Sequence, residues 1–465
     1  MFAPSVYESR RAALMGRVGS GLILLVGNRL IGMNYRANTY PFRQDGSFLY
    51  FTGLDEPDLL LLLDCDSGDA RLHGPALGLE HAIWSGPSPS LEDLATRAGL
   101  TCGAGLDKAR ASCRGALAQG RTIHYLPTYQ DGQTLALARF LGHDPERLER
   151  EASQILIAAV VGLRGPKSAD EVSEIRSAIA VSAEAYELLM RECRPGVSEM
   201  ELFGHMQGLV LSQGCAEAFP TILTRQGEVL HNHSHDRELV AGDLLLVDSG
   251  VRSKMGYASD ITRTLPVSGC MTARQRDIYD LVVAAQGAGV ARMAPDVPFL
   301  ECHLAAARVI AEGLRDLGLM RGNPDEAVAA GAHALFFPHG LGHMLGLDVH
   351  DMEGLGEDHV GYDQGFRRSQ QFGLSGLRMA RPLRPGFVMT VEPGIYFIPP
   401  LVARWREQRL HDAFIDYAAV ETWFGFGGIR IEDDVLVTDT GIEVLSVGIP
   451  KQSDEVCARM VACRC

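Results

Sequence analysis

The sequence of 465 residues lacks the features that mark several large classes of protein. Positive charge is in deficit: 43 Lys and Arg against 58 Asp and Glu give a formal net charge of −15. This balance argues against a nucleic acid or an anionic membrane as partner, because both attract basic surfaces. No apolar run approaches the roughly 20 residues that a membrane-spanning helix needs. Ten scattered cysteines do not make a disulfide scaffold, so reduced thiols are expected.

Short targeting and catalytic signatures are also missing. The segment Ser9-Arg10-Arg11 loosely resembles a twin-arginine signal, but the apolar run Leu22–Val26 is too short for a signal core. We therefore expect a cytoplasmic protein. No Walker-type loop, GxSxG elbow or HExxH motif occurs. At the C-terminal end, Cys457, Cys463 and Cys465 lie close together, and a frayed tail is expected there rather than a metal or redox clip.

The patterns that are present predict an α/β protein with two domains. Short apolar runs at 22–26, 59–63 and 122–126 indicate strands of a compact N-terminal domain, residues 1–164. The break at Gly165-Pro166 is followed by Ser168 and, three residues later, Glu171. This capping box predicts the start of a long helix and of a second domain, residues 165–465.

The second domain contains an approximate internal repeat. The segment Arg194–Ser198 separates two predicted helices, the second ending at Gly214. About one hundred residues later, Ala294–Pro298 separates two more, the second ending at Gly318. Strand-rich segments follow both pairs. The repeat predicts two similar α/β halves that face each other, with a site between them.

Two carboxylates stand in a pair of predicted strands. The strand Leu244–Val247 ends at Asp248, and the strand Tyr257–Leu265 contains Asp260. An antiparallel hairpin centred near Lys254 would place these carboxylates opposite each other, roughly 5 Å apart. Carboxylates that close repel unless a proton or a cation lies between them. The pair therefore predicts a divalent-cation site, whereas either residue alone would be an ordinary turn or capping Asp.

A glycine-rich segment carries three histidines, His339, His343 and His350. Glycine lets the backbone approach a ligand closely, and neutral imidazole is a common ligand of transition metals. The cluster predicts a metal or substrate site without assigning the individual roles. Another group, His231, His233 and His235, alternates like one face of a strand and fits either a metal site or an exposed loop.

Two glutamates stand at later predicted strands. Val388–Val391 runs directly into Glu392, and the two-residue period of a strand puts Glu432 on the face opposite Ile429 and Ile431. A carboxylate one step from the apolar core is costly unless it is paired. Glu432 therefore either forms a salt bridge with Arg430 or binds a cation.

The motifs occur in the order Val247–Gly250, Ser259–Thr264, His339–His343, Val391–Gly394 and Ile429–Asp433. This set resembles the pita-bread metallopeptidases, in particular aminopeptidase P and prolidase. The segments Pro41–Gln44, Tyr50–Gly53 and Glu56-Pro57 are similar to the creatinase-type N-terminal domain of the same enzymes. The resemblance covers nearly the whole chain. It implies a creatinase-like α/β domain, 1–164, followed by a pita-bread catalytic domain, 165–465.

The family implies two divalent metal ions, usually Mn2+, with Zn2+ or Co2+ as alternatives. By resemblance, Asp248 would hold one ion, His343 and Glu392 the other, and Asp260 and Glu432 both. Glu392 would carry a proton to the leaving nitrogen.

The remaining roles concern the substrate and the partners. His350 would steady the tetrahedral intermediate, and His339, Arg378 and Arg430 would lie near the substrate. His231 would contact the substrate as well, unless the short segment that follows it gives this role to His233. The implied substrates are small peptides with proline in second position, and the implied assembly is a homodimer or homotetramer.

Besides the short segment after His231, a second departure from the family and its mixed motifs keep several hypotheses open. Residues 398–424 form a long insertion, and the segments Leu377–Arg381 and Phe426–Gly428 look more like prolidase, whereas Tyr50–Gly53 looks more like bacterial aminopeptidase P. We favour an Xaa-Pro aminopeptidase, with a dipeptidase as the alternative. A non-catalytic binding module and a creatine hydrolase are disfavoured, because relatives of those kinds lack the metal ligands that are intact here.

Overall fold

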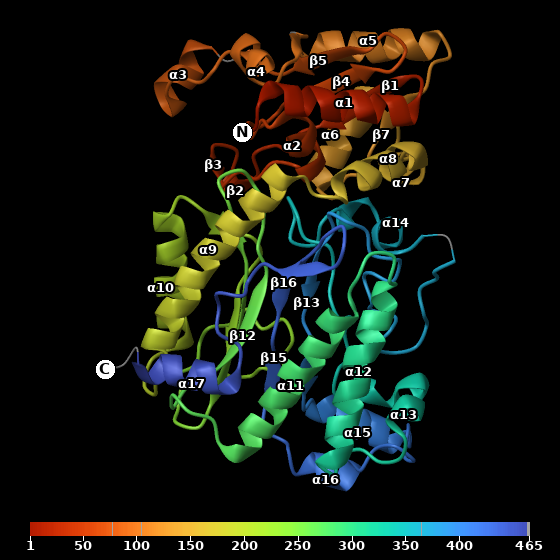
Figure 1. Ribbon diagram of the computed structural model, residues 1–465. Coiled ribbons are helices and arrows are strands. Elements are labelled where there is room, and N and C mark those ends of the chain that lie inside the picture. Colours follow the sequence, from red (N-terminus) through yellow and green to blue (C-terminus); the bar gives the residue numbers. More distant parts are fainter. Residues whose placement is uncertain (77, 104, 364, 463–465) are drawn as a thin grey trace. The chain divides into compact units, whose positions relative to one another are not determined.

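The computed structural model describes residues 1–76, 78–103, 105–363 and 365–462 (Figure 1). It confirms a mixed α/β protein. The chain divides into two compact units, one formed by Met1–Gly165 with Met352–His359, the other by Pro166–Asp351 with Val360–Cys465. No helix among the described residues is long and apolar enough to cross a membrane.

The first unit is built on a five-stranded mixed sheet in the order β6-β5-β4-β1-β7. Its central strand β1 pairs antiparallel with β4 and parallel with β7. The predicted strands near 22–26, 59–63 and 122–126 are thus confirmed, and their continuous apolar runs are buried, as expected of strands covered on both faces. The strands are β1 (Leu22–Val26), β4 (Leu60–Asp64), β5 (Asp69–His73), β6 (Thr101–Cys102) and β7 (Ile123–Tyr125), with a separate hairpin of β2 (Gly32–Tyr35) and β3 (Asn38–Thr39).

Eight helices of the described chain accompany this sheet: α1 (Pro4–Val18), α2 (Gly46–Thr52), α3 (Leu79–Ser85), α4 (Leu91–Arg97), α5 (Leu106–Ala118), α6 (Asp131–Leu141), α7 (Pro145–Arg150) and α8 (Gln154–Arg164). Helix α1 packs along α8 and α2. The buried Arg11 of α1 donates to the carbonyl oxygens of Phe51, Ala98 and Gly99, which holds three segments together.

The second unit repeats one arrangement twice. Helices α9 (Ala169–Glu192) and α10 (Glu199–Ser212) precede the strands β9 (Ile222–Thr224), β10 (Leu244–Ser249) and β12 (Ile261–Pro266). Helices α11 (Ala273–Arg292) and α12 (Phe299–Asp316) precede β13 (Val388–Val391), β16 (Asp433–Val437) and β17 (Ile442–Val444). Both predicted helix pairs are confirmed, and so is the capping box of Ser168 and Glu171 at the start of α9.

Each half packs its helices on its own three-stranded sheet, β12-β10-β9 in the first and β13-β16-β17 in the second. In the first half, Leu189 of α9, Leu202 of α10 and Val247 of β10 share one core with Val456 of the C-terminal helix α17 (Ser453–Ala462). An isolated antiparallel bridge between Thr262 and Glu432 connects the two halves. Residues of both halves therefore meet at one point.

The register of the β10–β12 hairpin differs from the prediction. Asp248 lies opposite Thr262, not opposite Asp260. The cause is the turn, which is centred on Met255 instead of Lys254: Arg252 bridges Ala258, and Gly256 adopts a φ of 91° that suits glycine. When the centre of the hairpin moves by one residue, the residue that lies opposite Asp248 moves by two. Because side chains alternate along a strand, Asp260 still faces the same side as Asp248.

The predicted insertion, 398–424, folds into α15 (Pro399–Glu407) and α16 (Tyr417–Glu421). It is attached to the segment that follows α12 by a bridge between Met320 and Ile415. The remaining elements are β8 (Ala216–Glu217), which pairs with β11 (Val251–Arg252), β14 (Gly394–Tyr396), which pairs with β15 (Gly428–Arg430), and the short helices α13 (Pro324–Ala330), η1 (Ala332–Leu335), η2 (Glu353–Leu355) and α14 (Glu357–Gly361).

Candidate metal centre

A cavity of about 430 Å³ in the second unit collects the polar residues singled out in the sequence. Its walls come from the ends of β10, β13 and β15, the start of β12 and the glycine-rich loop that follows η1. Its lining includes all five predicted ligands and six further predicted site residues: Asp248, Asp260, His343, Glu392 and Glu432, with His231, His233, His339, His350, Arg378 and Arg430.

The tightest cluster in the cavity is formed by Asp260, His343 and Glu432, which offer ligand atoms within 4.8 Å of one another. His343 Nε2 lies 3.4 Å from Asp260 Oδ2 and 3.7 Å from Glu392 Oε1. The other ring nitrogen, Nδ1, lies 3.1 Å from the carbonyl oxygen of Met344. A proton on Nδ1 satisfies that carbonyl and leaves the Nε2 lone pair facing the carboxylates, which is the tautomer a metal ligand needs.

Asp248 and Glu432 are held by different partners. Arg430 Nη2 donates to Asp248 Oδ2 at 2.6 Å, so the salt bridge of Arg430 is with Asp248, and the alternative in which it pairs with Glu432 is wrong. Glu432 Oε2 instead accepts a hydrogen bond from Thr262 Oγ1 at 2.6 Å. The second oxygens, Asp248 Oδ1 and Asp260 Oδ1, are buried without a hydrogen-bond partner among the described residues.

Burial and mutual repulsion shape the electrostatics of these carboxyl groups. Burial, followed by the charges of neighbouring carboxylates, raises the pKa values of Asp260 and Glu432 well above their usual range. Burial also raises the pKa of Glu392 to about 7, although the charges of His343 and Arg430 oppose the shift. The cavity thus holds more carboxylate charge than its own cations neutralise, a condition that a bound divalent cation relieves.

A hydrogen-bonded chain of three side chains forms one wall. Arg430 Nη1 donates to Tyr396 Oη at 2.8 Å, and Tyr396 Oη lies 2.9 Å from His339 Nε2. His339 Nδ1 lies 2.8 Å from the carbonyl oxygen of Gly340. Burial, together with the charge of Arg430, lowers the pKa of His339 to about 3, so this imidazole is neutral. Both nitrogens of His339 therefore have protein partners.

The other predicted histidines differ in their surroundings. The His350 ring centroid lies 4.0 Å from that of His343. His231 and His233 are exposed at the cavity, with ring centroids 6.5 Å apart. His235 is instead buried against Phe203, and its Nδ1 lies 3.1 Å from the carbonyl oxygen of Leu223. The alternation of the three histidines therefore does not make a common metal site, because the chain is not a strand there.

Sequence reasoning missed Tyr396 and Thr262. Thr262 lies two residues after Asp260 on the same face of β12, so the two-residue period was a usable signal. Tyr396 stands four residues after Glu392, and nothing in its local pattern distinguishes it from a core tyrosine.

Comparison with known proteins identifies the class. Residues 173–439 match the model of metallopeptidase family M24, and residues 7–124 match the N-terminal domain of aminopeptidase P. The chain belongs to metallopeptidase family M24 and is a hydrolase.

The chain is 33% identical to the Xaa-Pro dipeptidase of Homo sapiens over 441 residues, covering 91% of this chain and 85% of that protein. It is 31% identical to the Xaa-Pro aminopeptidase of Escherichia coli K12 over 474 residues, covering 98% of each. Among solved structures, the aminopeptidase PepP of Pseudomonas aeruginosa is similar with a TM-score of 0.82 at 31% identity, covering 100% of this chain and 99% of that one.

Proposed function

We propose that the chain is an Xaa-Pro aminopeptidase: a dinuclear-metal exopeptidase that hydrolyses the bond between an N-terminal residue and a following proline. The catalytic domain would be residues 165–465, after a creatinase-like domain of residues 1–164. The observation that carries the proposal is the convergence of Asp248, Asp260, His343, Glu392 and Glu432 on one cavity.

The donor set fits two divalent ions. Three atoms of the cavity can each donate an electron pair to a metal ion. They are the buried oxygens Asp248 Oδ1 and Asp260 Oδ1, which have no partner in the described chain, and Nε2 of His343. Four carboxylates with one imidazole favour a hard to intermediate ion, for which we choose Mn2+ over Zn2+ or Co2+. Asp248 would bind one ion, His343 and Glu392 the other, and Asp260 and Glu432 both. When bound, such ions supply Lewis acidity to a carbonyl and lower the pKa of water.

The chain's own groups would move the proton and hold the substrate. Glu392, whose Oε1 lies 3.7 Å from His343 Nε2, would accept a proton from the attacking water and pass it to the leaving nitrogen. His350, beside His343, would donate to the oxygen of the scissile carbonyl as negative charge develops there. Arg430 holds Tyr396, and through it His339, whose Nδ1 lies 4.0 Å from Glu392 Oε2.

The proline preference comes from the relatives, which are named for Xaa-Pro substrates. An Xaa-Pro bond lacks the N–H that other peptidases engage, so its recognition must rely on the carbonyl, the ring and the charged ends of the peptide. Arg378 and His231 line the cavity from outside the ligand cluster, and we assign them to the substrate. His233 is the alternative to His231.

We also propose a cytoplasmic homo-oligomer, a dimer or a tetramer. Support comes from the exposed apolar face of α3, on which Leu79, Ile83 and Trp84 are 77%, 68% and 81% exposed. Large apolar side chains grouped in this way are typical of an interaction surface. Sedimentation velocity of the wild type and of Trp84→Glu tests it: smaller species in the variant are expected, and a monomeric wild type would contradict it.

One sample tests the activity. Metal content is measured on the purified protein, and hydrolysis of Ala-Pro and of an Xaa-Pro-Xaa tripeptide is followed with and without Mn2+ and after chelation. Cleavage of both peptides that is lost on chelation supports the aminopeptidase. Cleavage of the dipeptide alone would make the protein an Xaa-Pro dipeptidase, the alternative that the human relative keeps open. Absence of both bound metal and cleavage would favour a binding module.

A further inference from the structure

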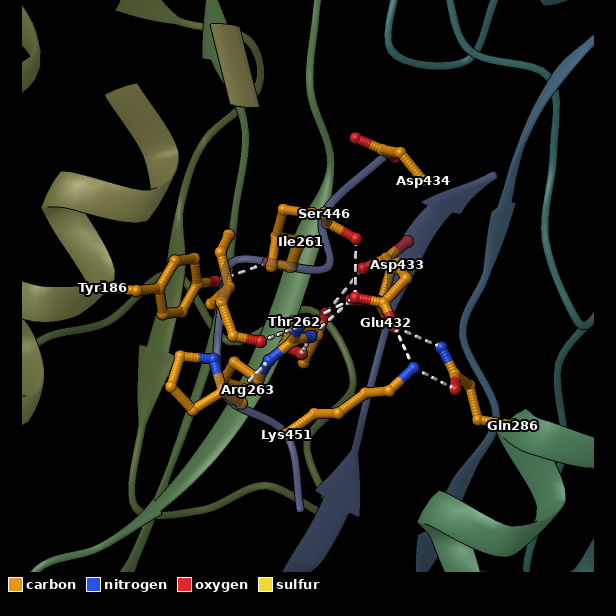
Figure 2. A network of polar contacts seen from close by, with 12 residues as sticks. Tyr186, Ile261, Thr262, Arg263, Gln286, Glu432, Asp433, Asp434, Ser446 and Lys451 are labelled. Carbon is orange, nitrogen blue, oxygen red and sulfur yellow. Dashed lines mark hydrogen bonds and ion pairs between the residues drawn. The ribbon is translucent and has the colours of Figure 1, made fainter. Parts of the chain in front are cut away.

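Behind the candidate metal centre, a buried polar network surrounds the side chain of Arg263 (Figure 2). Arg263 follows Thr262 on β12 and points to the opposite side of the strand from Asp260 and Thr262. Its side chain is 0% exposed. A buried guanidinium is costly unless its hydrogen bonds are satisfied. The partners of Arg263 therefore identify the segments whose positions it fixes.

All of the N–H groups of this guanidinium have acceptors. Nη1 donates to the carbonyl oxygens of Thr262 at 2.8 Å and of Glu432 at 2.6 Å. Nη2 donates to Asp433 Oδ1 at 2.7 Å and to the carbonyl oxygen of Ile449 at 2.9 Å, and Nε donates to the carbonyl oxygen of Pro450 at 2.9 Å. A guanidinium has five such donors in a fixed planar arrangement, so these acceptors cannot shift independently.

Thr262 and Arg263 together hold three atoms of Glu432. Its N–H donates to the carbonyl oxygen of Thr262 at 3.1 Å, its own carbonyl oxygen accepts from Arg263, and its Oε2 accepts from Thr262 Oγ1. Strand β12, which starts directly after Asp260, thus fixes the backbone of Glu432. Asp260 and Glu432 are the two residues to which we assigned the bridging position.

Asp433 extends the network to the C-terminal segment and to α11. Its Oδ1 accepts from Ser446 Oγ at 2.6 Å as well as from Arg263. Its Oδ2 accepts from Lys451 Nζ at 2.5 Å and from Gln286 Nε2 at 2.7 Å, and Lys451 Nζ also donates to Gln286 Oε1. The side chain of Lys451 is 26% exposed and that of Asp433 only 1%. Lys451 is therefore the member of the network that can be replaced with least disturbance of the core.

From these contacts we infer that Arg263, together with residues 446–451 and above all Lys451, positions Glu432 for metal binding. The inference rests on the proposed metal site and adds a segment that lies beyond the matched family region, which ends at residue 439. Without Lys451, Asp433 Oδ2 loses its cation and keeps the Gln286 amide as donor, so the buried charge of Asp433 is balanced by Arg263. A shift of that guanidinium toward Asp433 moves the Glu432 carbonyl, which is bound to the same guanidinium. Groups that hydrogen-bond a metal ligand, as Arg263 does here, typically change metal affinity 10- to 100-fold.

The test measures Mn2+ binding to metal-free protein by isothermal titration calorimetry, for the wild type, Lys451→Met, Lys451→Arg and Arg459→Met. The control Arg459→Met removes an exposed cation, paired with Glu187, from the same C-terminal region. We expect Lys451→Met to weaken at least one of the two binding steps about tenfold, Lys451→Arg to recover most of the affinity, and Arg459→Met to match the wild type.

A second variant, Arg263→Lys, keeps one charge but has at most three donors and cannot reach all the carbonyl groups. If it folds, we expect a larger loss of affinity than in Lys451→Met. Melting temperatures of the metal-free variants separate positioning from general stability. Unchanged Mn2+ dissociation constants in a folded Lys451→Met would overturn the inference, whatever its melting temperature. A wild type that binds no Mn2+ would overturn the proposed metal site itself, and the inference with it.

Discussion

Replacing Asp260 by Asn should abolish metal binding and leave the fold intact. The change removes one negative charge from a buried cluster in which oxygens of Asp260 and Glu432 and Nε2 of His343 lie within 4.8 Å of one another. Two carboxylate charges about 4.8 Å apart repel by about 3 kcal/mol at an effective dielectric constant of 20. Protonation relieves part of this repulsion, because the pKa values of Asp260 and Glu432 are raised. We expect the metal-free Asp260→Asn protein to be more stable than the metal-free wild type by about 1–2 kcal/mol.

Bound metal should make the wild type more stable than the Asp260→Asn variant. A ligand present at one hundred times its dissociation constant stabilises the folded protein by about 2.7 kcal/mol, which raises the melting temperature by about 4 °C for a unit of about 300 residues. Mn2+ should therefore stabilise the wild type strongly and Asp260→Asn little, and the variant should lose its peptidase activity. Differential scanning fluorimetry with and without Mn2+, together with metal analysis, measures both effects.

The matched control is Asp439→Asn, an exposed Asp of the same unit that should keep the full response to Mn2+. Full activity with two bound ions in Asp260→Asn would refute the assignment of this residue to both ions. A metal-free variant that is less stable than the wild type would refute the repulsion argument, even if the metal response were lost.

Three further changes test neighbouring parts of the site. His350→Ala should lower turnover far more than metal content; if metal is lost instead, His350 is a ligand. Lys167→Met breaks a 2.9 Å ion pair with Asp351 whose side chains are 2% and 1% exposed, so chemical denaturation should show a loss of about 3–5 kcal/mol, and a loss below 1 kcal/mol would contradict the buried pair. Gly342→Ala would press a methyl group onto the carbonyl oxygen of Thr390 and displace His343, so metal affinity should fall; unchanged affinity would show that the loop yields freely.

The sequence could predict those parts of the site that depend on local patterns of a few residues. Asp248 lies near the end of the buried strand β10, Glu392 directly follows β13, and three of the histidines occur in one glycine-rich segment, so local patterns were enough to select them. The helix pairs were predictable for the same reason, because caps and turn residues act within a few positions. These features depend on neighbours in sequence, and a single chain shows such neighbours directly.

The features that escaped prediction depend on contacts between distant segments or on one turn residue. Arg263 donates to Ile449, which stands 186 positions later, and no spacing indicates such a contact. The partner of Arg430 could not be chosen by sequence, because adjacency pointed to Glu432 while the fold brings Asp248 to it from 182 positions away. The predicted hairpin register was wrong by two residues because the turn is centred on Met255. The positive φ of Gly256 belongs to this turn.

The three consecutive carboxylates from Glu432 to Asp434 show why charge alone does not select a metal ligand. Burial opposes ionisation of Asp433, but Arg263 and Lys451 outweigh it and hold the pKa of this carboxyl well below its usual range, so its oxygens are already occupied by cations. Asp434 Oδ2 accepts the backbone N–H of Asp260 and thereby holds the backbone of this predicted ligand. Glu432 accepts a hydrogen bond from a hydroxyl group, and no cation of the described chain contacts it. Of the three adjacent acidic side chains, only Asp433 has cations in contact within the described residues, and of the other two it is Glu432 that lines the cavity.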